Sequence, residues 1–217
     1  MTEVSGKTVG LFRKISEHTG VSVDEMFAGC SLDPHAESDP EYVAWVEFCV
    51  LCRNAREACG SNQRLAEMGV EVLELPALGM FTRIIQLFAS AKTLYWANQR
   101  WTGPSAFTHL GNEFEELDNG LYRFTITIPD EHEDCPEFFH LNGGVLRVLP
   151  KLIGLPEAFV ELDVSPRRCV YTIDTPPSIT LWSRLRRAAS ILFGARTAIE
   201  ALGEQQTLLA RRYKELL

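Results

Sequence analysis

The sequence predicts an α+β fold, with a helical N-terminal half packed on a small antiparallel sheet of two hairpins and a long C-terminal coiled-coil helix. Three observations predict it. Apolar residues recur at helical spacing up to Trp101, two pairs of alternating segments follow, and the last segment holds a heptad pattern. We therefore expect two regions: a globular domain at 1–176 and a coiled-coil helix at 177–217.

The helical half is predicted from apolar spacing and from helix-end signals. Thr8–His18 has one apolar face and is followed by Gly20, a typical C-terminal stop. Ser22 and Glu25 have the spacing of a capping box for a short second helix. Pro40 suits the first turn of a long helix that runs to Cys59. Further helices are expected over 61–72, 79–89 and 90–101, so the first half is predicted to be all helix.

The sheet is predicted from alternating segments and turn residues. Asp118-Asn119-Gly120 separates two such segments, and Ser165-Pro166-Arg167-Arg168 separates two more. Each pair is expected to form a hairpin. Strands are expected over 107–116, 121–128, 158–164 and 169–173, with a helix over 137–152 between the hairpins.

The last helix carries the most regular pattern, because apolar residues from Leu181 to Leu216 alternate at spacings of four and three. A helix packed on its own domain would drift from this period, so a parallel homodimer is favoured over a core helix. Gln206 and two alanines lie in the seam of the predicted coiled coil, and they are compatible with two nearby registers of its two helices. The pattern runs to Leu217 without a capping glycine, as expected if an output domain follows. The predicted dimerisation residues are Leu185, Leu192, Ile199, Leu202, Gln206, Leu209, Tyr213 and Leu216.

The composition and net charge of the chain limit the kinds of partner that it is expected to bind. The 217 residues are 46% hydrophobic and carry a net charge of −8, which disfavours contact with nucleic acid and anionic membranes. The start lacks the features of a secretory signal, and no apolar run reaches the length of a membrane span, so we expect a cytoplasmic protein. The six cysteines lie in apolar segments and are expected to be reduced and mostly buried.

The sequence contains few motifs that are typical of metal binding or catalysis. Cys49-Val-Leu-Cys52 has the spacing of half a zinc knuckle but lacks a second pair, which favours buried thiols. Glu131–Cys135, with His140, gathers metal-type side chains, and a solvated acidic loop before a helix explains it better. Neither a Gly-x-Ser-x-Gly, a phosphate loop nor a His-Glu-x-x-His motif occurs. We therefore expect no metal, no catalytic residue and no enzyme.

Aromatic residues near the predicted change from helix to sheet could line an apolar pocket with a few polar groups. Ordinary core packing is the alternative for each of them. The candidate ligand-binding residues are Trp96, Trp101, Phe107, Phe139, His140 and Tyr171.

Phe138–Leu146, Leu152-Ile153-Gly154, Ala158–Glu161 and Arg167–Ile173 together resemble the closing section of the 4-vinyl reductase-like sensor domains. That superfamily includes haem nitric-oxide-binding domains. The resemblance implies helices on a small antiparallel sheet, dimerisation, and a pocket for a small apolar ligand between helices and sheet. The Tyr-x-Ser-x-Arg haem signature is absent and the zinc-type cysteine set is not reproduced around Cys169, so the cofactor is left unknown.

A second resemblance covers Gly20–Gly69, with Asp33-Pro34 between helices and a helix pair from Leu78-Gly79 before a hairpin. This arrangement is similar to the N-terminal effector domain of some AraC-type transcription regulators. Either resemblance implies a ligand-responsive module.

We expect a ligand-responsive sensory and dimerisation domain of a cytoplasmic bacterial signal-transduction protein, such as the histidine kinase of a two-component system. Its coiled coil would relay the signal to a C-terminal output domain. Two alternatives stay open: a structural or assembly protein that dimerises through the coiled coil without a ligand, and the effector domain of an AraC-type regulator.

Overall fold

The computed structural model describes residues 3–36, 38–74, 90–118 and 120–175. Its contacts divide the chain into a compact unit, Met1–Ser178, and a second unit, Ile179–Leu217. All described residues belong to the first unit. The predicted helix at 79–89 and the predicted coiled-coil helix, with every predicted dimerisation residue, lie outside the described residues.

The N-terminal helices follow the predicted end signals closely. The first helix ends at Gly20, whose φ is 72°, and the third ends at Gly60, whose φ is 74°. Both bonds of the predicted capping box at Ser22 and Glu25 are present. The Ser61 hydroxyl accepts a hydrogen bond from the Arg64 amide. These helices are α1 (Val9–Thr19), α2 (Val23–Met26), α3 (Trp45–Cys59) and α4 (Asn62–Glu67).

The predicted helix start at Pro40 was wrong, and so was the expectation of an all-helical first half. Strand β1 (Val4–Ser5) pairs antiparallel with β2 (Tyr42–Val43) ahead of α3. The close approach of the two segments depends on Gly6, where an added Cβ would lie 1.6 Å from the Pro40 carbonyl oxygen. A tertiary contact therefore overrides the local helical signal.

The chain from Ser90 to Leu110 differs from the prediction in its second part. Helix α6 (Ala91–Ala97) continues into a π-helical turn (Asn98–Thr102) and a short helix, α7 (Gly103–Ala106). Phe107 was predicted to begin a strand, but it forms only an isolated bridge to Val4. The strand begins four residues later, because the segment at Phe107 pairs with β1 and not with a strand of the main sheet.

Four antiparallel strands form the main sheet in the order β3-β4-β6-β5. Both predicted hairpins are present and are joined through β4 and β6. Phe124 lies opposite Tyr171, and both side chains are buried on the face that the helices cover. The strands are β3 (Gly111–Asp118), β4 (Leu121–Thr127), β5 (Phe159–Val164) and β6 (Arg168–Asp174).

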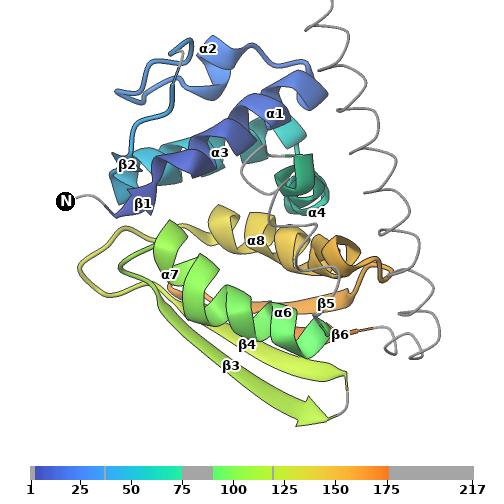
Figure 1. Cartoon of the computed structure of the whole chain (residues 1–217). Coiled ribbons are helices and arrows are strands. Elements are labelled where there is room, and N and C mark those ends of the chain that lie inside the picture. The colour runs from blue at the N-terminus through green and yellow to red at the C-terminus, as the bar shows by residue number, and fades with distance from the viewer. Residues whose placement is uncertain (1–2, 37, 75–89, 119, 176–217) are drawn as a thin grey trace, which may run out of the picture. The chain divides into compact units, whose positions relative to one another are not determined.

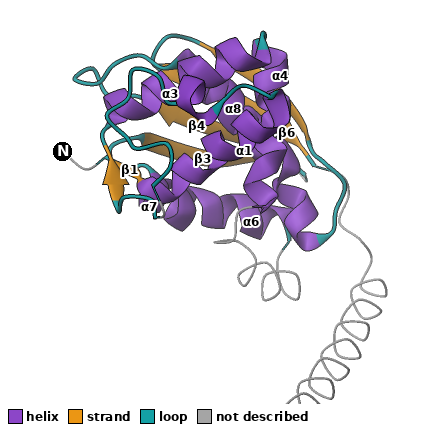
Figure 2. Cartoon of the chain, turned by 90° about the horizontal axis from the view of Figure 1, so that it is seen from above, coloured by secondary structure: helices purple, strands orange, loops and turns teal. Residues whose placement is uncertain are grey.

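Helix α8 (Pro136–Val148) lies between the N-terminal helices and the sheet (Figures 1 and 2). Two of its glycines allow close packing on opposite sides. A Cβ at Gly144 would lie 1.7 Å from the Ala66 carbonyl oxygen, and one at Gly143 would lie 2.9 Å from a Leu162 methyl group. A 3₁₀ turn (Leu149–Ile153) ends the helix at Gly154. Residues predicted as one helix at 137–152 thus form these two elements.

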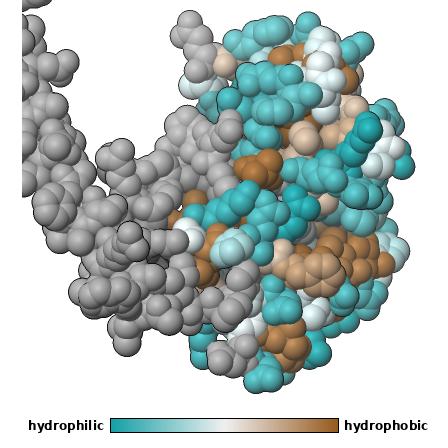
Figure 3. All heavy atoms as spheres, turned by 90° about the vertical axis from the view of Figure 1, so that its right-hand side faces the viewer, coloured by the Kyte–Doolittle hydropathy of each residue, from teal (hydrophilic) through white to brown (hydrophobic). Residues whose placement is uncertain are grey.

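The surface of the described residues is mainly hydrophilic on the face shown in Figure 3, with separate apolar patches. The most exposed large hydrophobic side chains described are Phe159, at 65%, and Trp101, at 60%. Among the described residues, no helix is long and apolar enough to cross a membrane.

Candidate functional site: an aromatic and thiol junction

An aromatic cluster joins the N-terminal helices to the second half of the chain. The Trp45 ring stacks on Phe48 at 5.6 Å and meets the Phe138 ring edge-on at 5.7 Å. Phe107 lies 4.9 Å from Phe138 and 5.3 Å from Phe48. We call this region, formed by α3, Phe107–Leu110, the loop 129–135 and the first turn of α8, the junction.

Hydrogen bonds from two buried or half-buried side chains hold the loop 129–135 in place. The Trp45 Nε1–H donates to the Glu133 carbonyl at 2.8 Å. Arg167 donates to the carbonyl of Pro129 at 2.9 Å and to that of His132 at 2.6 Å. A second Arg167 nitrogen lies 2.9 Å from the Asp134 carboxylate. Arg167, which was predicted to lie in the turn between two strands, therefore also fixes the loop that leads into α8.

Three buried thiols meet beneath this loop. Cys49 and Cys52 are one turn apart on α3, and Cys135 is the residue before the first turn of α8. The pKa of Cys135 is held below its usual range, chiefly by the neighbouring thiols of Cys49 and Cys52. The buried state predicted for these cysteines is confirmed. Their convergence was missed, because Cys135 belongs to a segment far along the chain from the Cys49-x-x-Cys52 pair.

Two histidines lie at the edge of the junction. The ring centroids of His109 and His132 are 4.4 Å apart, and His109 meets the Trp45 ring at 4.7 Å. Both ring nitrogens of His109 are buried. Burial, and then the neighbouring His132, lower the pKa of His109, while Glu3 and Glu131 oppose that shift. The neutral form of His109 is therefore the one that the fold favours.

This arrangement predicts a specific pH dependence of stability. Because the pKa of His109 is lower in the folded state, the unfolded chain binds more protons as the pH falls below about 6.5. The contribution of His109 to the unfolding free energy should be fully present above about pH 6.5 and should decrease as the pH falls towards the lower pKa of the folded state. Urea unfolding between about pH 7 and pH 5 measures the slope, which should become smaller in His109→Gln. A slope that is unchanged in His109→Gln would contradict the assignment.

The predicted ligand-binding residues fall into separate groups. Trp96 and Trp101 form an exposed edge-to-face pair with ring centroids 5.0 Å apart. Phe107 belongs to the junction. Phe139 and Tyr171 are fully buried between α8 and β6, where the Tyr171 hydroxyl donates to the Phe139 carbonyl at 3.0 Å.

His140 lies on another side of α8, half-buried and 3.0 Å from the Asn62 amide nitrogen. Burial lowers the pKa of His140. The structure therefore brings Phe139 and Tyr171 together and Trp96 and Trp101 together, but it does not bring all six residues to one place.

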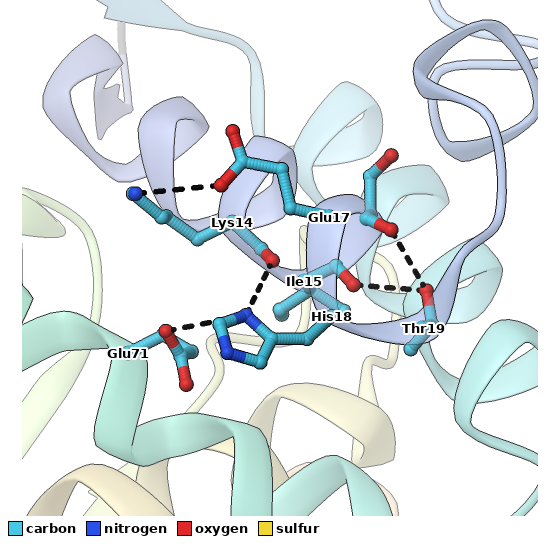
Figure 4. Close-up of polar contacts among 7 residues, drawn as sticks. Lys14, Ile15, Glu17, His18, Thr19 and Glu71 are labelled. Atoms are coloured by element: carbon cyan, nitrogen blue, oxygen red, sulfur yellow. Dashed lines mark hydrogen bonds and ion pairs between the residues drawn. The ribbon is translucent and has the colours of Figure 1, made fainter.

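A further polar contact links α1 to the 3₁₀ turn Met68–Glu74 (Figure 4). The His18 Nδ1 atom lies 3.5 Å from the Glu71 carboxylate and 3.2 Å from the Lys14 carbonyl, to which it donates. Glu71 is only 5% exposed. This buried carboxylate could not be found from the sequence, since Glu71 lies among ordinary helical residues.

The acidic loop predicted before α8 is present, with Glu131, Glu133 and Asp134 exposed. Among the residues that the structure describes, no group of three or more His, Cys, Asp or Glu side chains has an arrangement suited to a metal ion.

Comparisons with known proteins give a match in structure alone. No protein-family profile matches the sequence, and no curated protein matches it either. An Fe(II) unliganded H-NOX protein from K. algicida has a TM-score of 0.59 at 10% identity, covering 81% of this chain and 97% of its own. An oxygen-binding H-NOX domain related to soluble guanylate cyclases has a TM-score of 0.56 at 12% identity, with the same coverage.

The H-NOX domain SO2144 from Shewanella oneidensis, solved as an H103G mutant in the Fe(II)CO ligation state, has a TM-score of 0.56 at 10% identity. The match covers 81% of this chain and 99% of that domain. At these identities the likeness concerns the fold, which is the mixed helix-and-sheet fold of H-NOX domains.

Proposed function

We propose that this chain is a ligand-responsive sensory domain of a signal-transduction protein, and that it passes its state to residues 177–217 and to an output domain beyond them. The observation that carries the proposal is the likeness in fold to H-NOX domains, which extends over 97% or more of three such chains. One of these is an oxygen-binding domain related to soluble guanylate cyclases.

The residues described here do not fit a haem, the group for which the H-NOX fold is named. A haem needs an axial side chain that faces a space wide enough for the macrocycle. His109 is packed against Trp45 and His132, and His140 is bonded to Asn62. Where the N-terminal helices meet α8, their backbones touch at Gly144 and Ala66. The proposed function therefore does not include a haem cofactor.

A small apolar ligand suits the proposal better. Phe139 and Tyr171 are buried between α8 and β6, and His140 lies on another side of the same helix, against Asn62. Aromatic side chains of this kind are typical of the lining of sites for small apolar ligands. A ligand changes the output only if it binds one of two arrangements more tightly than the other. We propose that the two arrangements differ in the register of a parallel homodimer formed by 177–217.

The test uses the whole chain. A panel of small aromatic and aliphatic compounds, with haemin as a separate arm, is screened for a rise in melting temperature. A compound that binds should also change hydrogen exchange within 177–217 and leave the chain dimeric in sedimentation. Bound compounds that never alter exchange there would contradict the proposal, as would tight haemin binding with a ligated-iron spectrum and binding of no other compound.

Alanine at His140 provides the residue-level test. His140→Ala should weaken the affinity of a bound compound about ten-fold or more while leaving the unfolding free energy within about 0.5 kcal/mol. His35, an exposed histidine that contacts Asp24, is the matched control. Equal losses of affinity in His35→Ala and His140→Ala would show that His140 is not part of the binding site.

A further inference from the structure

The main sheet has two outer strands, β3 and β5, and their edges are protected to different degrees (Figure 1). An outer strand offers unpaired backbone groups to other chains, so proteins usually bend or cover it. In β3 the register shifts between Glu116 and Asp118. The Gln99 side chain, from the π-helical turn, also donates to the β3 carbonyl of Asn112 at 3.1 Å. Both features limit the addition of a further strand at β3.

Strand β5 is regular along its whole length. All of its residues pair with β6 in one unbroken register. Just beyond the strand, the Ser165 amide donates to the Arg168 carbonyl at 2.8 Å, and opposite residues of an antiparallel ladder alternate between bonded and non-bonded pairs. The amides and carbonyls of Val160, Leu162 and Val164 therefore point away from β6. Among the residues that the structure describes, none forms a backbone hydrogen bond with these outward groups.

The side chains of β5 alternate between α8 and solvent. Leu162 lies against Gly143 of α8, so Phe159, Glu161 and Asp163 lie on the opposite face of the strand, where all of them are exposed. The exposed fraction of Phe159, 65%, is the largest of any large hydrophobic side chain that the structure describes. An aromatic side chain and two carboxylates thus form a row along the open edge.

The carboxylates of the two outer strands also differ in their partners. On β3, Glu115 forms an ion pair with Arg123 at 2.8 Å. On β5, Glu161 and Asp163 lie opposite uncharged residues of β6, and they form no ion pair within the described part of the chain. Two-fold pairing of β5 with a second copy would put carboxylate opposite carboxylate, which is unfavourable. A strand that carries Lys or Arg at these positions would be attracted.

We propose that β5 binds an extended basic segment of another protein, which adds antiparallel to the sheet as a further strand. Lys or Arg side chains of that segment lie opposite Glu161 and Asp163, and an apolar side chain lies opposite Phe159. The residues between them exchange backbone hydrogen bonds with Val160 and Leu162. Main-chain bonds supply affinity, and the two carboxylates select charge and register. The net charge of the chain, −8, attracts such a segment from a longer distance.

A designed peptide tests this edge in the whole chain. A fluorescein-labelled peptide with the core Lys-Val-Lys-Val-Phe places its lysines opposite Asp163 and Glu161 and its phenylalanine opposite Phe159. We expect saturable binding in fluorescence anisotropy and slower hydrogen exchange at the amides of Val160 and Leu162. N-methylation of both valines removes the donors that face β5 and should weaken binding about ten-fold or more. The same residues in the order Lys-Lys-Phe-Val-Val should bind as weakly.

Charge reversal on each outer strand provides matched variants. Glu161→Lys with Asp163→Lys should weaken binding about ten-fold or more, whereas Glu113→Lys with Glu115→Lys on β3 should change it by less than about three-fold. Melting curves of both double variants verify folding.

Four outcomes would overturn the proposal. They are equal losses in the two double variants, equal binding of the N-methylated peptide, equal binding of the reordered peptide, and no binding below about 1 mM. Dissociation of a dimer by the peptide in sedimentation would assign the edge to a second copy and would also overturn it. None of these results depends on the sensory function proposed above, because the experiment adds no sensory ligand.

Discussion

Alanine at position 144 is expected to lower the unfolding free energy by about 3 kcal/mol, at the upper end of what overpacking costs. The added Cβ would lie 1.7 Å from the Ala66 carbonyl oxygen, and on the opposing segment Gly69 meets the backbone of Gly144 in the same way. Backbone stands on both sides of this contact, so no side-chain rotation can relieve it. Urea unfolding of Gly144→Ala compared with the wild-type chain measures the loss.

The neighbouring glycine is the matched control. Gly143→Ala, in the same helix, would place its Cβ 2.9 Å from a methyl group of Leu162, a side chain that can rotate away. Both substitutions gain about 1 kcal/mol in helix propensity, so Gly143→Ala should be near neutral. Equal stabilities of the two variants would show that α8 and α4 are not in backbone contact.

Removal of the Trp45 side chain should cost about 3–5 kcal/mol. Trp45 is buried and contacts Phe48, Phe138 and His109, and its Nε1–H satisfies the Glu133 carbonyl. Trp45→Ala therefore removes ring contacts on several sides and also releases the loop before α8. Chemical denaturation followed by far-ultraviolet circular dichroism measures the change without relying on tryptophan fluorescence.

Phenylalanine at the same position separates packing from hydrogen bonding. Trp45→Phe keeps a ring among the aromatic side chains but leaves the Glu133 carbonyl without its donor, which should cost about 1–3 kcal/mol. We also expect faster proteolysis within 129–135 in this variant. A Trp45→Phe variant as unstable as Trp45→Ala would instead assign most of the effect to the shape of the indole.

Local signals predicted the fold where short-range chemistry decides it. The capping box at Ser22, the helix ends at Gly20 and Gly60, and the two hairpins all depend on residues a few positions apart. The β1–β2 pair depends on Val4 meeting Val43, and no local pattern announces that contact. The late start of β3 has the same cause, since Val4 also bridges to Phe107.

The site was less predictable than the fold. The Cys49-x-x-Cys52 spacing and the presence of Cys135 in an acidic loop were both visible in the sequence, but separately. Their meeting depends on how α3 packs against the start of α8, which is a tertiary contact. His109 gave no signal, because a histidine inside a predicted strand is ordinary until Trp45 and His132 are placed beside it.

The contacts of Glu3 and Val4 with residues 107 and 108 affect the order in which the chain can fold during synthesis on the ribosome. The Glu3 carbonyl accepts a hydrogen bond from the Thr108 amide, and Val4 bridges to Phe107. The first residues to leave the exit tunnel must therefore wait until position 108 has been synthesised before these bonds can form. During translation, the first helices therefore lack these contacts until residues 107 and 108 are available. In that period, chaperones that bind exposed apolar segments can act on them.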